Sequence, residues 1–174
     1  MKIPVIETSR LTLRAHHVDD FPACAAMWAD PNVTRYIGGK PSTRDETWSR
    51  LLRYAGHWAL LEFGYWAAIY KATGTFVGEL GFADFKRDIV PSFDGVPEIG
   101  WAFASAVSGK GYASEAVSAI VAWGDAHLGS RRTVCIIHPE NLASIRVAAK
   151  SGFCEFQRTT YKGAPTIMFE RGAK

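Results

Sequence analysis

The chain has 174 residues, with 20 Lys and Arg against 17 Asp and Glu and a formal net charge of +3. Hydrophobic residues make up 48% of it and aromatic residues 13%, which is enough apolar surface for a packed core and excludes a disordered chain. This length is typical of one domain, so we expect residues 1–174 to form a single unit.

The sequence also argues against a secreted, membrane-bound or nucleic-acid-binding protein. No uncharged apolar run approaches the roughly 18 residues that a membrane span needs. Residues 1–10 carry Glu7 and lack the apolar centre of a signal peptide. The C-terminal third is basic, but it has no dense basic run of the kind found in nucleic-acid-binding arms. We therefore expect a cytoplasmic protein.

The three cysteines, Cys24, Cys135 and Cys154, are widely spaced. No Cys-x-x-Cys motif and no Cys/His cluster occurs in the sequence, so neither a disulfide framework nor a zinc site is expected. We interpret the cysteines as buried thiols.

The N-terminal part of the chain predicts one strand and two helices. Residues 6–14 alternate between apolar and polar side chains, which is typical of a strand. Asp19 or Asp20 can begin a short helix that ends before Pro31. The stretch Thr43-Arg-Asp-Glu46 is a capping-box pattern, and the helix that it begins has one apolar face.

Strands and hairpins dominate the rest of the chain. In order, the patterns predict a hairpin (65–70 and 75–82), a loop (83–97), a strand (98–106), a helix (113–129), a strand (133–137), a helix (141–150) and two strands (153–161 and 166–171). Because strands outnumber helices, we expect an α+β fold in which helices pack on a mixed, mostly antiparallel sheet.

The segment from Ser108 to Ala113 lies between a predicted strand and a predicted helix. Its two glycines allow a tight turn and the close approach of a bulky anion. The helix start beyond them offers unpaired N–H groups and the positive end of the helix dipole. The segment is therefore a candidate pyrophosphate cradle. The alternative is an ordinary tight turn that uses glycine for its backbone conformation.

Nearly the whole chain resembles the GNAT N-acetyltransferase superfamily, in particular its RimJ/RimL-type branch, which acetylates the N-termini of ribosomal proteins. The stretches that carry the resemblance, in the expected order, are Glu7–Arg14, Asp30–Val33, Tyr65–Ala67, Gly78–Gly81, Glu98–Trp101, Gly109–Ala116, Asn141–Arg146 and Lys150–Phe153. The resemblance implies a mostly antiparallel sheet of six to seven strands, flanked by about four helices and splayed at the coenzyme site.

The resemblance also implies which residues bind acetyl-CoA. Backbone N–H groups of the family's loop bind the coenzyme pyrophosphate, and the matching residues here are Ser108, Gly109, Lys110, Gly111, Tyr112 and Ala113. The strand that carries Trp101 and Phe103 would line up with pantetheine through main-chain groups. Asn141 matches a family residue that hydrogen-bonds pantetheine.

The candidate catalytic residues are Ser144 and Glu98. Many relatives use a tyrosine to protonate the departing thiolate, but that position is Ala148 here, and Ser144 matches the hydroxyl to which the RimL-like branch assigns this role. Ser144 could instead be a small packing residue. Glu98 could take a proton from the amine, directly or through water, or be a solvated carboxylate at a strand start. Glu79 and Asp84 are fallback bases.

The resemblance implies an enzyme that transfers acetyl from acetyl-CoA directly to an amine, most simply a protein or peptide N-terminal α-amine. Two alternatives stay open, a small-molecule amine acetyltransferase and a non-catalytic CoA-binding module. A homodimer fits the habit of the family. Of the other residues considered, Tyr36 and Trp66 could line an acceptor pocket or belong to the core, and His138 is interpreted as a loop-packing residue.

Overall fold

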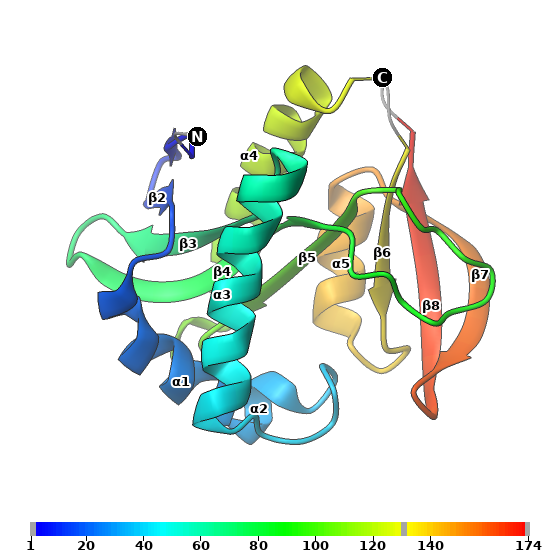
Figure 1. The fold of residues 1–174 in the computed structure, drawn as a ribbon, viewed down its shortest axis with the longest axis horizontal. Helices are drawn as coiled ribbons and strands as arrows, with labels where there is room; N and C mark the ends of the chain where they lie inside the picture. Colours follow the sequence, from blue (N-terminus) through cyan, green and yellow to red (C-terminus); the bar gives the residue numbers. More distant parts are fainter. Residues whose placement is uncertain (1–2, 130–131, 173–174) are drawn as a thin grey trace.

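The computed structural model describes residues 3–129 and 132–172 and contains one eight-stranded sheet (Figure 1). The strand order is β1-β2-β3-β4-β5-β6-β8-β7. The strands are β1 (Ile6–Glu7), β2 (Leu11–Arg14), β3 (Tyr65–Tyr70), β4 (Thr75–Ala83), β5 (Glu98–Phe103), β6 (Thr133–Ile137), β7 (Cys154–Tyr161) and β8 (Ala164–Arg171). Every neighbouring pair is antiparallel except β5 and β6.

Within the described residues, five α-helices flank the sheet. They are α1 (Phe21–Ala29), α2 (Pro31–Thr34), α3 (Arg44–Leu61), α4 (Tyr112–His127) and α5 (Leu142–Lys150). In Figure 1, α3 crosses in front of the sheet near β4 and β5, α1 lies next to the lower part of α3, and α4 lies behind the sheet. The strand register agrees with this arrangement, because alternate residues of β4 and β5 face the two helical layers.

The parallel pair β5 and β6 is joined at one register position only, Glu98 with Val134. By contrast, β5 pairs with β4 along its whole length. Among the described residues, the edge of β5 that faces β6 therefore has no strand partner beyond Glu98. The two strands diverge toward their carboxyl ends, and the segments that follow them lead into α4 and α5. This splay is the feature that the family resemblance implied.

The α+β fold with a mostly antiparallel sheet is confirmed. The capping box is confirmed as well, since the Thr43 hydroxyl accepts from the backbone N–H of Glu46 and the Glu46 carboxylate accepts from that of Thr43. Gly152 follows α5 with a φ of 84°, as expected for a left-handed residue after a helix.

The structure differs from the sequence predictions in several places. The predicted strand 98–106 ends at Phe103, and Ser105–Val107 form a short 3₁₀ helix instead. The sheet has eight strands rather than six or seven, partly because Thr8 forms a turn to Leu11 that divides the predicted strand 6–14 into β1 and β2. A short helix, α2, begins at Pro31, because Asp30 caps it by accepting from the backbone N–H of Asn32. The β7–β8 turn is shorter than predicted, since β8 already begins at Ala164.

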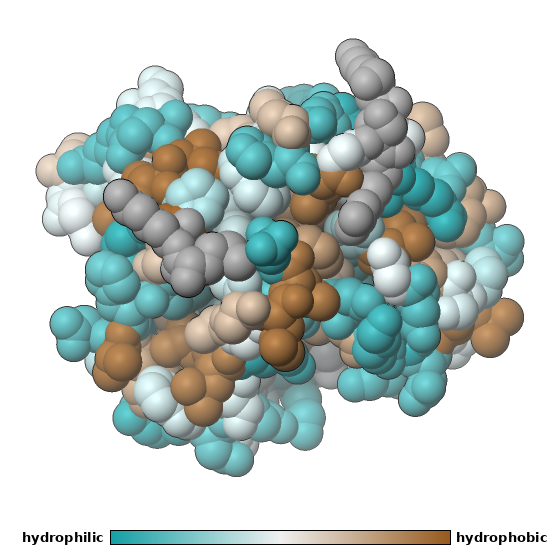
Figure 2. Space-filling model, turned by 45° about the horizontal axis from the view of Figure 1, so that its top comes forward, coloured by the Kyte–Doolittle hydropathy of each residue, from teal (hydrophilic) through white to brown (hydrophobic). Residues whose placement is uncertain are grey.

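The described helices include none that is long and apolar enough to cross a membrane. Figure 2 shows one face of the molecule, on which apolar side chains gather in small patches between hydrophilic ones.

The core between the sheet and α4 contains a cluster of three tryptophans, Trp58, Trp66 and Trp123, whose rings meet edge to face. Trp66 is fully buried there, so it belongs to the core.

Candidate active site

The loop between β5 and α4 has the geometry of an anion cradle. Gly109 and Gly111 have φ angles of 75° and 80°, a backbone region that residues other than glycine rarely adopt. No heavy atom lies within 4 Å of the position that a Cβ on Gly109 would take, so the space above this glycine is open. Ser108 and Lys110 are exposed beside it.

Gly111 is the N-cap of α4, and the first intrahelical hydrogen bond runs from the N–H of Glu115 to the Gly111 carbonyl. The N–H groups of Tyr112 and Ala113 precede that bond, so they have no intrahelical acceptor. The Tyr112 ring packs against Tyr70, with 5.4 Å between the ring centres, and is largely buried. The part of Tyr112 that can bind a ligand is therefore its backbone N–H.

An ion pair from the start of the chain holds this loop. Glu115, in the first turn of α4, accepts from the Thr8 hydroxyl, the Arg10 backbone N–H and Arg10 Nε at 2.6, 2.7 and 2.7 Å. Arg10 Nη1 donates to the Lys110 carbonyl at 2.8 Å. Burial raises the pKa of Glu115, but the hydrogen bonds from Thr8 and Arg10 outweigh burial and hold the pKa below its usual value.

The side chains of Trp101 and Phe103 pack against the core on the α4 side of the sheet. Their backbone lies on the part of β5 that has no pairing with β6. Main-chain groups of this stretch can therefore bind an extended ligand in the splay, as the resemblance implied for pantetheine.

Asn141 and Ser144 lie together at the start of α5, beyond the carboxyl end of β6. The Asn141 side-chain oxygen caps the helix by accepting from the Ser144 backbone N–H at 3.2 Å. Its amide group keeps two N–H donors for a ligand. The Ser144 side chain is half-buried, whereas Ala148, one turn later, is fully buried.

Glu98 is not the solvated carboxylate that was one alternative for it, since only 3% of the residue is exposed. Both of its carboxylate oxygens accept from Arg87, at 2.6 and 2.7 Å. Arg87 Nη1 also donates to the Tyr161 hydroxyl, so the pair connects β5 with β7 across the splayed strands. Burial raises the pKa of Glu98, and the Arg87 guanidinium opposes that rise.

A buried polar cluster covers the α1 and α3 side of the sheet. Glu79, on β4, accepts from Trp28 Nε1 at 2.9 Å and from the Tyr54 hydroxyl at 2.6 Å, and it is 1% exposed. The Tyr54 ring stacks on Tyr65 at 4.3 Å. The Tyr65 hydroxyl in turn lies against Gly100 of β5, 2.1 Å from where a Cβ would stand, so only glycine fits there.

His16 and Cys24 lie beside Glu79, and their potential ligand atoms all fall within 4.8 Å of one another. Burial lowers the pKa of His16 and raises that of Cys24. The sequence shows no such cluster, because Glu79 is far along the chain from His16 and Cys24. Cys24 and Cys135 are buried as expected, but Cys154 is exposed, since it begins an outer strand of the sheet.

His138 is held in its loop by a hydrogen bond and a ring contact. Its Nδ1 accepts from the Glu140 backbone N–H at 3.2 Å, and its ring stacks on Tyr36 at 5.2 Å. This agrees with its interpretation as a loop-packing residue. The contact also brings the segment after α2 next to the segment after β6.

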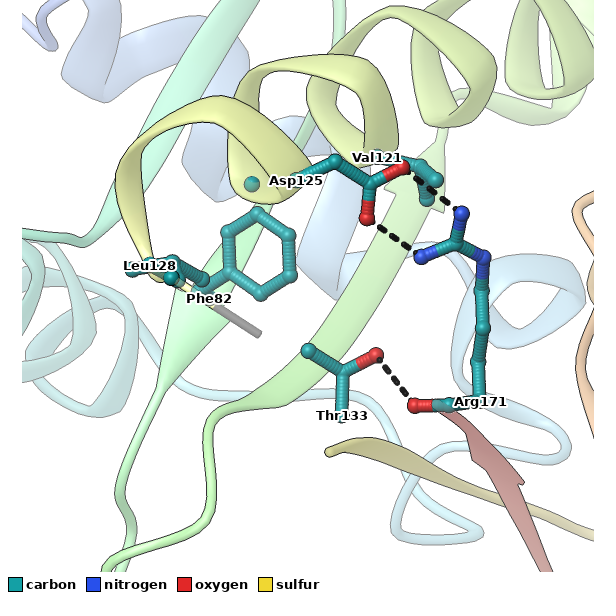
Figure 3. A pocket seen from close by; sticks show the side chains of 8 residues that line it. Phe82, Val121, Asp125, Leu128, Thr133 and Arg171 are labelled. Atoms are coloured by element: carbon teal, nitrogen blue, oxygen red, sulfur yellow. Dashed lines mark hydrogen bonds and ion pairs between the residues drawn. The ribbon is translucent and has the colours of Figure 1, made fainter. Parts of the chain in front are cut away.

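The hollow in Figure 3 lies at the other end of α4 from the cradle. Its lining includes Phe82 and Leu128, and Arg171 forms a paired ion contact with Asp125 beside it. A helix of 16 residues is about 24 Å long, so this hollow is far from the Gly109–Gly111 loop. It is separate from the candidate site.

Sequence reasoning missed Arg87 and the Arg10–Glu115 pair. Glu115 is 105 positions from Arg10, and Arg87 stands in a predicted loop with no periodic pattern. The resemblance did include the stretches that contain Arg10 and Glu115, and it was the only signal that could have pointed to them.

Residues 10–154 match the family described as "Acetyltransferase (GNAT) domain". The uncharacterized protein YkkB of Bacillus subtilis (strain 168) is 33% identical over 169 residues, which cover 94% of this chain and 93% of that protein. The solved structure of a putative GnaT-family acetyltransferase from Bordetella pertussis has a TM-score of 0.85 at 33% identity, and the match covers 97% of this chain and 99% of the other.

A RimL ribosomal L7/L12 α-N-protein acetyltransferase, solved in complex with coenzyme A, is similar in fold. Its TM-score is 0.78 at 16% identity, and the match covers 97% of this chain and 98% of RimL. At this level of identity the likeness shows the fold alone.

Proposed function

This chain belongs to the GNAT acetyltransferase family, and from that premise we propose that it acetylates the α-amine of a protein or peptide N-terminus. It is an acetyl-CoA-dependent N-acetyltransferase, and the acceptor is what the proposal adds. The observation that supports acetyl transfer at this site is the splay between β5 and β6. One register pair joins β5 to β6, and the Gly109–Gly111 loop and the starts of α4 and α5 follow the diverging ends.

These residues suit acetyl-CoA in charge and in shape. The Ser108–Ala113 segment offers backbone N–H groups and the positive end of α4 to the pyrophosphate. The free edge of β5 at Trp101 and Phe103, together with the Asn141 amide, would hold pantetheine in the splay. Pantetheine held in this way would bring the thioester near Ser144.

The residues of this chain would act mainly by positioning. Holding an amine and a thioester at attack distance supplies a large part of the acceleration of such reactions. A main-chain N–H of β5 would stabilise the negative charge that develops on the thioester carbonyl oxygen. The Ser144 hydroxyl would donate to the departing sulfur.

Glu98 would receive the proton that the amine loses, either directly or through water. Its oxygens accept from Arg87, but a carboxylate has about four lone-pair sites, so two remain for a water or an ammonium group. Burial raises its pKa, and a base whose pKa lies nearer to neutrality is better matched to its task.

Direct transfer fits the cysteines of the chain. Cys135 is buried within β6, and burial raises the pKa of its thiol, so it is not an activated nucleophile.

An α-amine, with a pKa of about 8, loses its proton more easily than a lysine at about 10.4. RimL, which is similar to this chain in fold, is by its name an α-N-protein acetyltransferase, and this is the acceptor class that we propose.

The first experiment is calorimetric titration with acetyl-CoA, followed by thiol-release assays on peptides with free N-termini and on small amines. We expect micromolar binding at one site per chain and faster turnover of peptides. Faster turnover of small amines would overturn the acceptor proposal. Binding without turnover of any amine would favour a coenzyme-binding module, and no binding up to millimolar concentration would overturn the site.

A further inference from the structure

The ion pair between Arg10 and Glu115 joins the first two strands of the sheet to the cradle. Arg10 Nε and its backbone N–H both donate to Glu115, while Nη1 donates to the Lys110 carbonyl, so one side chain holds both the loop and the first turn of α4. The Arg10 guanidinium also lies over the Tyr112 ring, 4.5 Å from its centre. These contacts hold the guanidinium next to the loop and the first turn of α4.

The remaining nitrogen of Arg10 lies beside the cradle itself. Nη2 is 3.4 Å from the position that a Cβ on Gly111 would take. The Arg10 side chain is 41% exposed, so its charge is not shut away from a ligand on the loop.

The loop needs an external support. Two glycines with positive φ angles flank Lys110, and glycine-rich backbone loses more conformational entropy on ordering than any other. A loop that is ordered before the coenzyme arrives avoids that loss at binding. Arg10 provides this order through the Lys110 carbonyl, the one backbone acceptor between the two glycines.

Charge gives Arg10 a second role. The hydrogen bonds that hold the pKa of Glu115 low keep this side chain negative at neutral pH. The carboxylate stands in the first turn of α4, at the helix end where the coenzyme pyrophosphate would bind. Without a neighbouring cation it would repel that anion, because charges near a protein surface still interact over several ångströms. Arg10 compensates it.

We propose that Arg10 is a positioning residue for the coenzyme, which orders the Gly109–Gly111 loop and compensates the charge of Glu115 beside the pyrophosphate. The inference rests on the proposed coenzyme site. It goes beyond that site, because it makes coenzyme affinity depend on a residue of the β1–β2 turn.

The test is a double-mutant cycle on acetyl-CoA affinity, measured by calorimetry with Arg10→Gln, Glu115→Gln and the double variant. We expect Arg10→Gln to weaken binding about tenfold, the size of one lost charge interaction. Glu115→Gln should weaken it only about threefold. The double variant should bind more tightly than Arg10→Gln alone, because no uncompensated carboxylate remains. The deficit of Arg10→Gln should also shrink at high salt.

Arg132→Gln is the matched control, since it breaks an exposed Arg–Glu pair of the same 2.6–2.7 Å length away from the cradle, and it should leave affinity unchanged. Arg10→Lys should restore part of the affinity by returning the charge. If the double variant binds no better than Arg10→Gln, or Arg10→Gln binds like wild type, the inference is overturned and the proposed function stands. If wild type itself fails to bind, both are overturned.

Discussion

Ser144 lies at the start of α5 with a half-buried side chain, and its backbone N–H is held by the Asn141 cap. We expect Ser144→Ala to lower kcat by about ten- to a hundredfold, which is a modest contribution for one proton-transfer group. Acetyl-CoA affinity should stay unchanged, since the cap uses the Ser144 backbone. Steady-state thiol release together with calorimetry measures both. An unaltered kcat would return Ser144 to a packing role.

Glu98 is tested by the pH dependence of Glu98→Gln. If Glu98 accepts the amine proton, the variant should lose about ten- to a hundredfold in kcat/KM near pH 7. The loss should shrink above about pH 9, where a free α-amine with a pKa of about 8 has already lost its proton. A deficit of the same size at every pH would instead assign Glu98 to holding Arg87, with which it forms its two short contacts.

At the scale of the elements, the start of α3 gives a prediction about stability. Thr43→Ala removes the hydroxyl that accepts from the Glu46 backbone N–H and should lower the free energy of unfolding by about 1 kcal/mol. Thr43→Ser keeps that hydroxyl and should remain close to wild type. Chemical denaturation of the three proteins measures the difference. Equal losses in both variants would show that the methyl group, rather than the cap, stabilises this end.

The elements that sequence predicts well are those with local causes. The α3 start follows from Thr43 and Glu46, and the α5 start follows from Asn141, each within four residues. The division of the first strand depends instead on the Thr8 turn, and α2 depends on Asp30 as its cap. Both contacts are local in sequence. The alternation of apolar and polar residues in 6–14 predicts one continuous strand, however, and a proline at position 31 predicts the end of a helix rather than a new one.

The site divides in the same way. Its glycines and its Asn141–Ser144 segment stand in contiguous motifs, so the sequence could place them. The partners that hold them could not be placed, because Arg10 reaches Glu115 across 105 positions of the chain and Arg87 reaches Glu98 from an irregular loop. Side-chain contacts of this kind leave no periodic pattern in a single sequence.

For the whole molecule, His16 gives a prediction about acid stability. Burial lowers the pKa of His16, although Glu79 and Asp20 oppose it. The unfolded chain therefore takes up a proton near pH 6.5, while the folded chain does so only at lower pH, so stability falls as pH decreases through this window. His57 has a pKa shift in the same direction.

We expect His16→Phe to lose less stability than wild type between pH 7.5 and pH 5.5, because phenylalanine keeps the ring contact with Tyr54 and has no proton to bind. Denaturant unfolding at the two pH values measures this. His127→Gln changes an exposed histidine and serves as the control. Identical pH dependence in wild type and His16→Phe would remove His16 as a source of acid sensitivity.

The single register pair between β5 and β6 also has a mechanical consequence. The sheet consists of two antiparallel halves, β1–β5 and β6–β8–β7. The two halves meet at the β5–β6 junction, where a single register pair joins them, so this junction is the weakest part of the sheet. A coenzyme bound along that junction would bridge the halves and would add to the free energy of unfolding by mass action. The concentration of acetyl-CoA would then affect the stability of the protein as well as its rate of turnover.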